Sequence, residues 1–319
     1  MPWKTLILAV QITMAFAILG CSLPGSSGAH SRKQGNSAIR LGWRDNSLAL
    51  PVVIEGIPGC LMLDTGSYDT YLNTRTAGAM GVSLRKTDVR IRGIAGSQSD
   101  VMEGRISARV RGLGPKAFRG LSGNHRFRPM PDQYVPGMGA SLGNLGLEQL
   151  AEANALVDCA NGTLTIAAPG TAHPLPRGWQ ELPLVKHRFD SGGFMWAVPV
   201  TIGQADGLMI VDTLAGISLI GEPFARSIGI ELNASAVNAY GVGGWAGALQ
   251  EGKTPELAVA GRVNLGRIGV LSSAMKIFER SDRNAHGKMV PIVGLLGMDQ
   301  LIRMKARFDC ARGVLQVRP

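Results

Sequence analysis

Two acidic residues, Asp64 and Asp212, are the side chains that the sequence places best for chemistry. Each ends an apolar run and is followed by threonine, in LMLDTGS at residues 61–67 and in LMIVDTL at residues 208–214. A carboxyl group held at the edge of a core can exchange a proton with a bound molecule, so this pattern indicates acid–base chemistry. Aspartate, threonine, glycine and serine are also common turn residues, so the short motif alone is more typical of a strand that runs into a turn.

The chain repeats itself, and the two acids occupy equivalent places in the repeat. Pro51-Val52 recurs as Pro199-Val200 and Asp64-Thr65 recurs as Asp212-Thr213, both 148 positions later. Further on the offset becomes 151: GNLGLEQL at 143–150 matches GLLGMDQL at 294–301, and VDCANGTL at 157–164 matches FDCARGVL at 308–315. Matches in constant order and spacing indicate two copies of one structural unit.

The same elements are predicted around the acid in each copy. A β segment (48–54 or 196–202) turns into the strand that ends at the acid, and a glycine-rich turn follows between β segments at 93–96 or 241–244. A short helix is expected near 147–155 and near 298–305. Each copy closes with a hairpin that turns at Asn161-Gly162 or Arg312-Gly313. The 43 glycines in 319 residues also favour a turn-rich, mostly β fold.

Five segments follow from this division. We predict a signal peptide at 1–20, a lipidated tether at 21–37, a first lobe at 38–168, a linker at 169–180 and a second lobe at 181–319. Lys4 precedes an apolar stretch that is short for a membrane span, and the ending ILGC at 18–21 resembles a bacterial lipoprotein signal. That resemblance implies lipidation of Cys21 and, with Ser22 next to it, sorting to the periplasmic face of the outer membrane. An ordinary signal followed by a chance cysteine is the alternative.

The order of features resembles the retropepsin-like and pepsin-like aspartic peptidases over nearly all of the mature chain. The shared parts are an apolar strand that ends in Asp-Thr-Gly, a later glycine-bearing hairpin, and a Leu-Gly segment before a short helix. The resemblance implies two β-barrel lobes related by a pseudo-two-fold axis, in which Asp64 and Asp212 form one catalytic dyad. Two adjacent carboxyl groups share one proton, so that one activates water while the other polarises the scissile carbonyl.

The resemblance also assigns roles to residues near the acids. Thr65 and Thr213 are expected to brace one loop against the other, Gly66 to allow close backbone approach, and Ser67 to support the first loop. The glycine turns are expected to be flaps that close over an extended peptide. These substrate-binding residues are Gly93, Ile94, Ala95, Gly96, Gly241, Val242, Gly243, Gly244 and Trp245. Trp245 either lines a subsite or packs on its own lobe.

The second copy departs from the pattern because Leu214 occupies the expected glycine position. Either the loop adjusts and keeps its backbone N–H available, or this half of the site is inactive. Ser67 could donate a hydrogen bond to Asp64, whereas the side chain of Ala215 offers none to Asp212. We therefore expect Asp64 to ionise more readily and Asp212 to hold the shared proton.

Composition excludes several other classes of function. The formal charge of +10 comes from scattered basic residues, including the run HRFR at 125–128, which we interpret as a solvated basic face rather than a nucleic-acid site. The five histidines lack metal-ligand spacing, and we expect no cofactor and no metal. Cys159 could pair with Cys310, Cys60 could pair with Cys159, or all three could be buried free thiols.

The sequence thus predicts an exported, lipid-anchored aspartic endopeptidase that acts as a monomer on extended polypeptide, with Asp64 and Asp212 as its acids. The main alternative is a non-catalytic lipoprotein that binds peptide in the same two-lobed cleft, for which Leu214 is the supporting feature. A third possibility uses Asp64 alone, in a dimer of first lobes.

Overall fold

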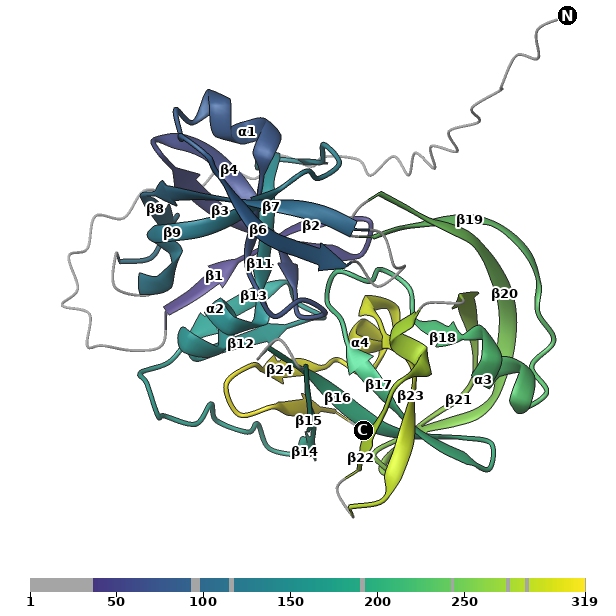
Figure 1. Ribbon diagram of the computed structural model, residues 1–319. Coiled ribbons are helices and arrows are strands. Elements are labelled where there is room, and N and C mark those ends of the chain that lie inside the picture. The colour runs from purple at the N-terminus through teal and green to yellow at the C-terminus, as the bar shows by residue number, and fades with distance from the viewer. Residues whose placement is uncertain are drawn as a thin grey trace, which may run out of the picture. The chain divides into compact units, whose positions relative to one another are not determined.

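The apolar runs before the two acids form central strands of two separate β-sheets (Figure 1). The computed structural model describes residues 37–92, 98–114, 118–189, 193–241, 244–273, 276–284 and 287–318. The predicted signal peptide, the lipidation site Cys21 and nearly all of the predicted tether lie outside these residues and stay predictions. Within the described part of the chain, no helix is both long enough and apolar enough to cross a lipid bilayer.

The first copy forms a ten-stranded sheet that carries Asp64 at the end of β4. In spatial order its strands are β2 (Gly42–Arg44), β3 (Ser47–Ile54), β4 (Ile57–Asp64), β11 (Gly139–Gly146), β5 (Tyr71–Asn73), β9 (Gly123–Arg128), β7 (Gln98–Ile106) and β6 (Arg85–Arg92). Two short strands pair at its side, β8 (Ala108–Val110) with β3 and β10 (Tyr134–Val135) with β11.

The second copy forms a nine-stranded sheet in which β17 leads into Asp212. Its order is β15 (Val185–Arg188), β16 (Phe194–Ile202), β17 (Ala205–Val211), β23 (Met289–Leu296), β18 (Leu219–Gly221), β21 (Val263–Ser273), β20 (Gly244–Val259) and β19 (Asn233–Gly241), with β22 (Ser281–Arg283) beside β23. In both copies the strand that leads to the acid has a parallel neighbour, β11 or β23, which itself pairs antiparallel with a short strand, β5 or β18.

A glycine marks the place where these strands cross in each copy. The register between β4 and β11 skips one residue just before Gly143, and the register between β17 and β23 skips one just before Gly294. A Cβ atom would lie 2.3 Å from the Tyr71 carbonyl oxygen at Gly143 and 2.1 Å from the Leu219 carbonyl oxygen at Gly294. Only glycine lets the three backbones approach this closely, which explains why both copies contain it.

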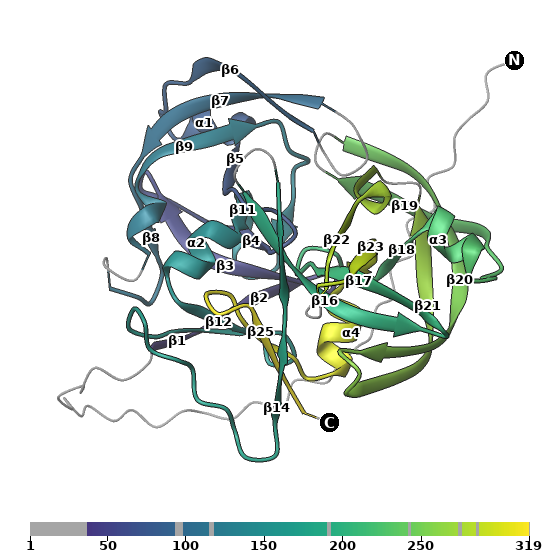
Figure 2. The same ribbon diagram turned by 60° about the horizontal axis from the view of Figure 1, so that its bottom comes forward.

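A third sheet joins the two copies. Its six strands run in the order β1 (Ser37–Arg40), β13 (Thr163–Ile166), β12 (Ala155–Asp158), β24 (Arg307–Asp309), β25 (Val314–Val317) and β14 (Gln180–Pro183). Strands β12 and β24 come from different copies and pair antiparallel, with Val157 opposite Phe308, and β25 lies beside β14 (Figure 2). The predicted closing hairpins are confirmed: Gly162 and Gly313 adopt φ of 60° and 64° at the two turns.

Four short α-helices complete the described fold: α1 (Thr74–Ala79), α2 (Leu147–Glu152), α3 (Glu222–Ser227) and α4 (Met298–Arg303). Single 3-10 turns occur at Arg119–Leu121 and Lys276–Glu279. Helices α2 and α4 lie where the repeat predicted them, although each ends a little earlier than expected. The predicted mostly β fold with two equivalent lobes is therefore confirmed.

Candidate active site

The two predicted acids lie on two loops that meet between the lobes. Asp64 is the last residue of β4 and Asp212 follows β17, and their side chains are only 5% and 6% exposed. A Cβ atom at position 66 would lie 2.4 Å from the Asp212 Oδ2 atom, so Gly66 of the first loop touches the acid of the second. The Gly66 N–H also faces both carboxyl groups closely enough to favour their ionised forms. The structure thus brings the two acids to a common neighbour.

The threonines that follow the acids lock the loops together. The Thr65 hydroxyl donates to the Val211 carbonyl oxygen at 2.8 Å and accepts the Thr213 N–H at 3.1 Å. The Thr213 hydroxyl donates to the Leu63 carbonyl oxygen at 2.9 Å and accepts the Thr65 N–H at 3.2 Å. Both threonines are fully buried, so no water competes for these reciprocal bonds. The contacts expected of Thr65 and Thr213 are present.

The hydrogen bonds to the two acids differ between the copies. Asp212 Oδ1 accepts the N–H groups of Leu214, at 2.8 Å, and Ala215, at 3.1 Å. Asp64 Oδ2 instead accepts a side-chain donor, the Asn144 Nδ2 group of β11, at 3.0 Å. The predicted hydrogen bond from Ser67 to Asp64 is wrong, because the Ser67 hydroxyl donates to the Asp69 carbonyl oxygen.

These contacts affect the pKa values of the two acids differently. Burial, followed by the negative charge of Asp212, raises the pKa of Asp64 to about 7. Burial also raises the pKa of Asp212, but the N–H groups of Leu214, Ala215 and Gly66 act against it. Asn144, Arg128 and Gly66 act in the same direction on Asp64, but only Asp212 accepts two N–H groups of its own loop, and we infer from this difference that Asp212 ionises first and Asp64 holds the proton. The opposite expectation, drawn from Ser67 and Ala215, considered only side-chain donors and not the backbone N–H groups that donate to Asp212.

Leu214 is accommodated without loss of the second loop. Its side chain packs against a first-lobe cluster that includes Cys60 and Met62, and its carbonyl oxygen accepts a hydrogen bond from the Ser47 hydroxyl at 3.2 Å. Its backbone N–H still reaches Asp212, as the first of the two predicted alternatives required. The bulky residue at the expected glycine position thus turns into the opposite lobe and helps to hold the two lobes together.

Asn144 is a site residue that sequence reasoning missed. It lies in GNLGLEQL, whose repeat partner GLLGMDQL has Leu295 at the matching position. In the alignment of the two copies, an asparagine matches a leucine within segments that are otherwise similar. This difference could have identified Asn144 as a candidate site residue. The parallel register then places Asn144 beside Met62, two residues before Asp64 on the same face of the sheet.

Arg128 is a second missed residue. It ends β9, is only 3% exposed, and stacks over the ring of Tyr71 at 5.1 Å from the centroid. Its positive charge favours the ionised form of Asp64 and so lowers the pKa of that acid, against the larger effect of burial. The interpretation of the HRFR run as a solvated face is therefore wrong for Arg128.

The structure describes only some of the residues of the predicted flaps. Residues Gly93, Ile94, Ala95 and Gly96 lie outside the described residues, as do Val242 and Gly243. In the second copy, β19 and β20 form a hairpin in which Gly241 pairs with Gly244 and Tyr240 with Trp245. A hairpin between β segments is therefore present at the predicted place, and its role as a flap and the role of Trp245 stay predictions.

The cysteines and potential metal ligands form no further centre in the described residues. Cys60, Cys159 and Cys310 are buried free thiols, so the structure has neither of the two disulfides considered from the sequence. No group of three or more histidine, cysteine, aspartate or glutamate side chains in the described ranges could hold a metal ion.

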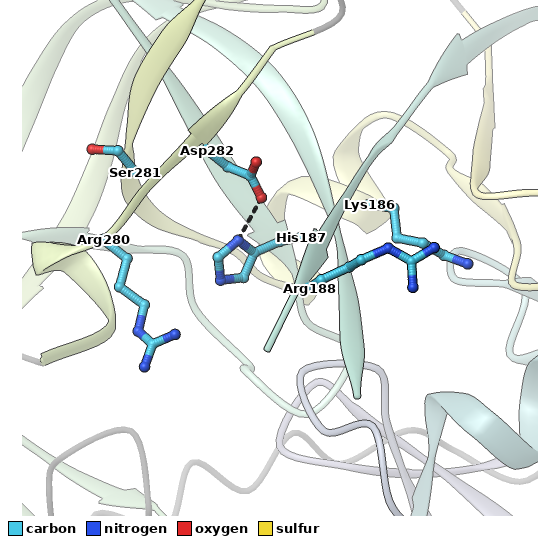
Figure 3. Close-up of a pocket in the computed structure, with 6 residues that line it drawn as sticks. All are labelled: Lys186, His187, Arg188, Arg280, Ser281 and Asp282. Carbon is cyan, nitrogen blue, oxygen red and sulfur yellow. Dashed lines mark hydrogen bonds and ion pairs between the residues drawn. The ribbon is translucent and has the colours of Figure 1, made fainter. Parts of the chain in front are cut away.

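A separate pocket of about 390 Å³ lies in the second lobe (Figure 3). Its lining comes from β15 and from the segment around β22: Lys186, His187, Arg188, Arg280, Ser281 and Asp282. The His187 Nδ1 atom contacts Asp282 Oδ2 at 2.7 Å, as the dashed line in Figure 3 marks. None of the predicted site residues lines this pocket, so it is distinct from the Asp64–Asp212 site.

Comparison with known proteins concerns the fold. No protein-family model matches the chain, and no curated protein does. Among solved structures, the chain is similar to the aspartic proteinase from Irpex lacteus, with 12% identity, a TM-score of 0.48, and coverage of 89% of this chain and 97% of that chain. It is also similar to EIAV protease complexed with the inhibitor HBY-793, with 18% identity, a TM-score of 0.25, and coverage of 33% of this chain and 85% of that chain.

The crossed strands, the repeated lobes and the interlocked Asp–Thr loops define a fold of the aspartic-peptidase type. The prediction of a retropepsin-like and pepsin-like fold from the sequence is confirmed.

Proposed function

We propose that the chain is an aspartic endopeptidase with a dyad of Asp64 and Asp212. The observation that carries this proposal is the reciprocal pair of threonine bonds, which fixes two buried acids around the Gly66 N–H. A catalytic constellation must be held rigidly, and bonds between fully buried groups meet that need. Leu214 no longer favours the non-catalytic alternative, because its N–H supports Asp212.

The geometry suits general acid–base catalysis on an amide. Ionised Asp212 accepts a proton from a water molecule as the water oxygen bonds to the amide carbon, while protonated Asp64 donates its proton to the carbonyl oxygen. The resulting tetrahedral intermediate returns its hydroxyl proton to Asp64, and Asp212 passes its proton to the leaving nitrogen as the C–N bond breaks. The products are a carboxylic acid and an amine, and the dyad regains its single shared proton.

The finer features of the function belong to the same proposal. The substrate is a polypeptide in extended conformation, which pairs with the flap hairpins as an added strand. The chain acts as a monomer because it contains both copies of the unit. It is exported and held by a lipid on Cys21 at the periplasmic face of the outer membrane, as the ILGC ending implies.

Cleavage of an unfolded protein tests the proposal. A soluble form that begins at Ser22 is incubated with a reduced and alkylated polypeptide from pH 3 to pH 8, and new termini are identified by mass spectrometry. Asp64→Asn and Asp212→Asn should each abolish cleavage. Asp206→Asn is the matched control, because it removes the charge of an aspartate in β17 that is about half exposed.

Two outcomes would contradict the dyad. Cleavage that survives Asp212→Asn would favour the single-acid dimer. A folded wild-type protein that cleaves no polypeptide at any pH would leave peptide binding as the function of the cleft.

A further inference from the structure

One face of the ten-stranded sheet carries the candidate site, and strand register identifies the other residues on it. Met62 lies opposite Asn144, Asn144 opposite Tyr71, and Tyr71 opposite Arg126 across four neighbouring strands. Side chains two residues apart on one strand share a face, so Asp64 and Arg128 lie on this face too. The other face belongs to the core and includes Leu61, Leu63, Leu72, Phe127 and Leu145. Arg128 is therefore on the same side of the sheet as the catalytic acid.

The two arginines on this face differ in their partners. Arg126 is half-exposed and pairs with Asp69, whose carboxylate also accepts the Tyr71 hydroxyl at 3.0 Å. Arg128 is nearly fully buried, yet it forms no ion pair in the described part of the chain, and its Nε atom has no hydrogen-bond partner there. Buried arginines in folded proteins are almost always paired, because burial of an uncompensated charge destabilises the fold. Arg128 thus lacks the counter-ion that its burial calls for.

The nearby acidic residues do not serve as the counter-ion of Arg128. Asp69 is already shared by Arg126 and Tyr71. Neither carboxyl group of the candidate site forms an ion pair with Arg128: Asp64 accepts the Asn144 side chain, and Asp212 accepts the N–H groups of its own loop. Arg128 therefore keeps a buried donor without a hydrogen-bond partner among the described residues, on the face of the sheet that carries Asp64. A guanidinium offers five donors in a planar fork that matches a carboxylate.

We propose that Arg128 forms a subsite that binds the carboxylate of an aspartate or glutamate side chain of the substrate. This inference rests on the proposed peptidase function and adds a substrate preference to it. Among the described residues, the strand register gives the second lobe no matching arginine: Arg128 pairs with Asn73, and Ser273 of β21 pairs with Gly221 at the equivalent position. The acidic residue should therefore be required at one fixed position, on one side of the scissile bond.

A peptide library with amidated C-termini tests the preference. The wild-type protein should cleave most rapidly where aspartate or glutamate occupies one fixed position, and a glutamate-to-glutamine change there should lower kcat/KM by about 10-fold to 100-fold. Arg128→Met should remove that difference, and Arg128→Lys should keep part of it. Arg75→Met is the matched control, since it removes an exposed arginine of the same lobe and should leave the preference unchanged. Peptides with free C-termini show whether a terminal carboxylate can replace the side chain.

The outcomes separate the subsite from the peptidase function. Cleavage without an acidic preference, or a preference that persists in Arg128→Met, overturns the subsite and leaves the peptidase intact. If no peptide is cleaved, the peptidase fails, and the subsite is judged by binding of fluorescent acidic and neutral amidated peptides; equal affinities overturn it. Thermal unfolding reports the fold of the variants. Arg128→Met should not lower the midpoint, because it removes an unpaired buried charge, and Arg128→Lys supplies a second folded variant.

Discussion

Replacing Asn144 with leucine should extend the activity of the proposed Asp64–Asp212 dyad to higher pH. Leucine is the residue that the second copy has at this position, so the change removes the donor to Asp64 and keeps a side chain of similar size. A hydrogen bond to a charged group contributes about 1.5 to 3 kcal/mol. Since one pKa unit corresponds to about 1.4 kcal/mol, its loss should raise the pKa of Asp64, now about 7, by about 1 to 2.

The sign of the effect follows from the roles of the two acids. Asp64 must keep its proton in the active form, so a higher pKa moves the alkaline limb of the pH–rate profile upward. The acidic limb reports protonation of Asp212, whose backbone donors are untouched, and it should stay in place. Both limbs are properties of the pair, so the comparison is between whole profiles.

The pH dependence of kcat on an unfolded substrate measures this prediction. Titration of Asp64 by NMR of 13C-labelled carboxyl groups measures it independently of activity. Asn124→Leu, the same change at an exposed position of β9, is the control. An alkaline limb that stays fixed or moves to lower pH in Asn144→Leu would refute the assignment of the proton to Asp64.

Three further predictions concern the loops and the buried thiols. Gly66→Ala should lower kcat by about 100-fold or more, because the new methyl group would displace the carboxylate of Asp212. The control Gly114→Ala adds a methyl group in open space and should have no effect. A Gly66→Ala variant with activity within tenfold of wild type would contradict the prediction. Thr65→Val should lower the free energy of unfolding in urea by about 2 to 4 kcal/mol, because two buried backbone groups lose their partner, while the exposed Thr171→Val should change it little. The three described thiols have raised pKa values because they are buried, so a form that begins at Ser22 should react with maleimide only after unfolding; rapid labelling of the native protein at pH 8 would disprove their burial.

The internal repeat made most of the fold predictable. A spacing of 148 residues, which becomes 151 further along the chain, identified the equivalent acids, threonines and strands, because each element of one copy must fit the same contacts as its partner. The glycines at 143 and 294 show why such signals persist: the crossing backbones leave no space for a Cβ atom in either copy. The positions of the hairpins and of α2 and α4 followed from the same comparison.

The differences between the copies could not be predicted from the motif alone. The donor to Asp64 comes from β11, 80 residues further along the chain, and only the strand register brings Asn144 to it. Ser67 was expected to be that donor because it is near in sequence, but its hydroxyl satisfies its own turn. Arg128 was interpreted as solvated because its neighbours are charged, and its burial depends on the groups packed around it, such as the ring of Tyr71, since Arg126 on the same face of β9 is half-exposed.

The covalent joining of the two copies has an evolutionary consequence. In an enzyme assembled from identical subunits, every substitution near the axis enters the site twice, so an arginine such as Arg128 would bring a second positive charge to the same two acids. A single gene that encodes both halves escapes this constraint, and each half can then specialise. Here one half carries Asn144 and Arg128, and the other carries Leu295 and Leu214. With the proposed function, natural selection could thus change substrate preference through one lobe while the other kept the chemistry constant.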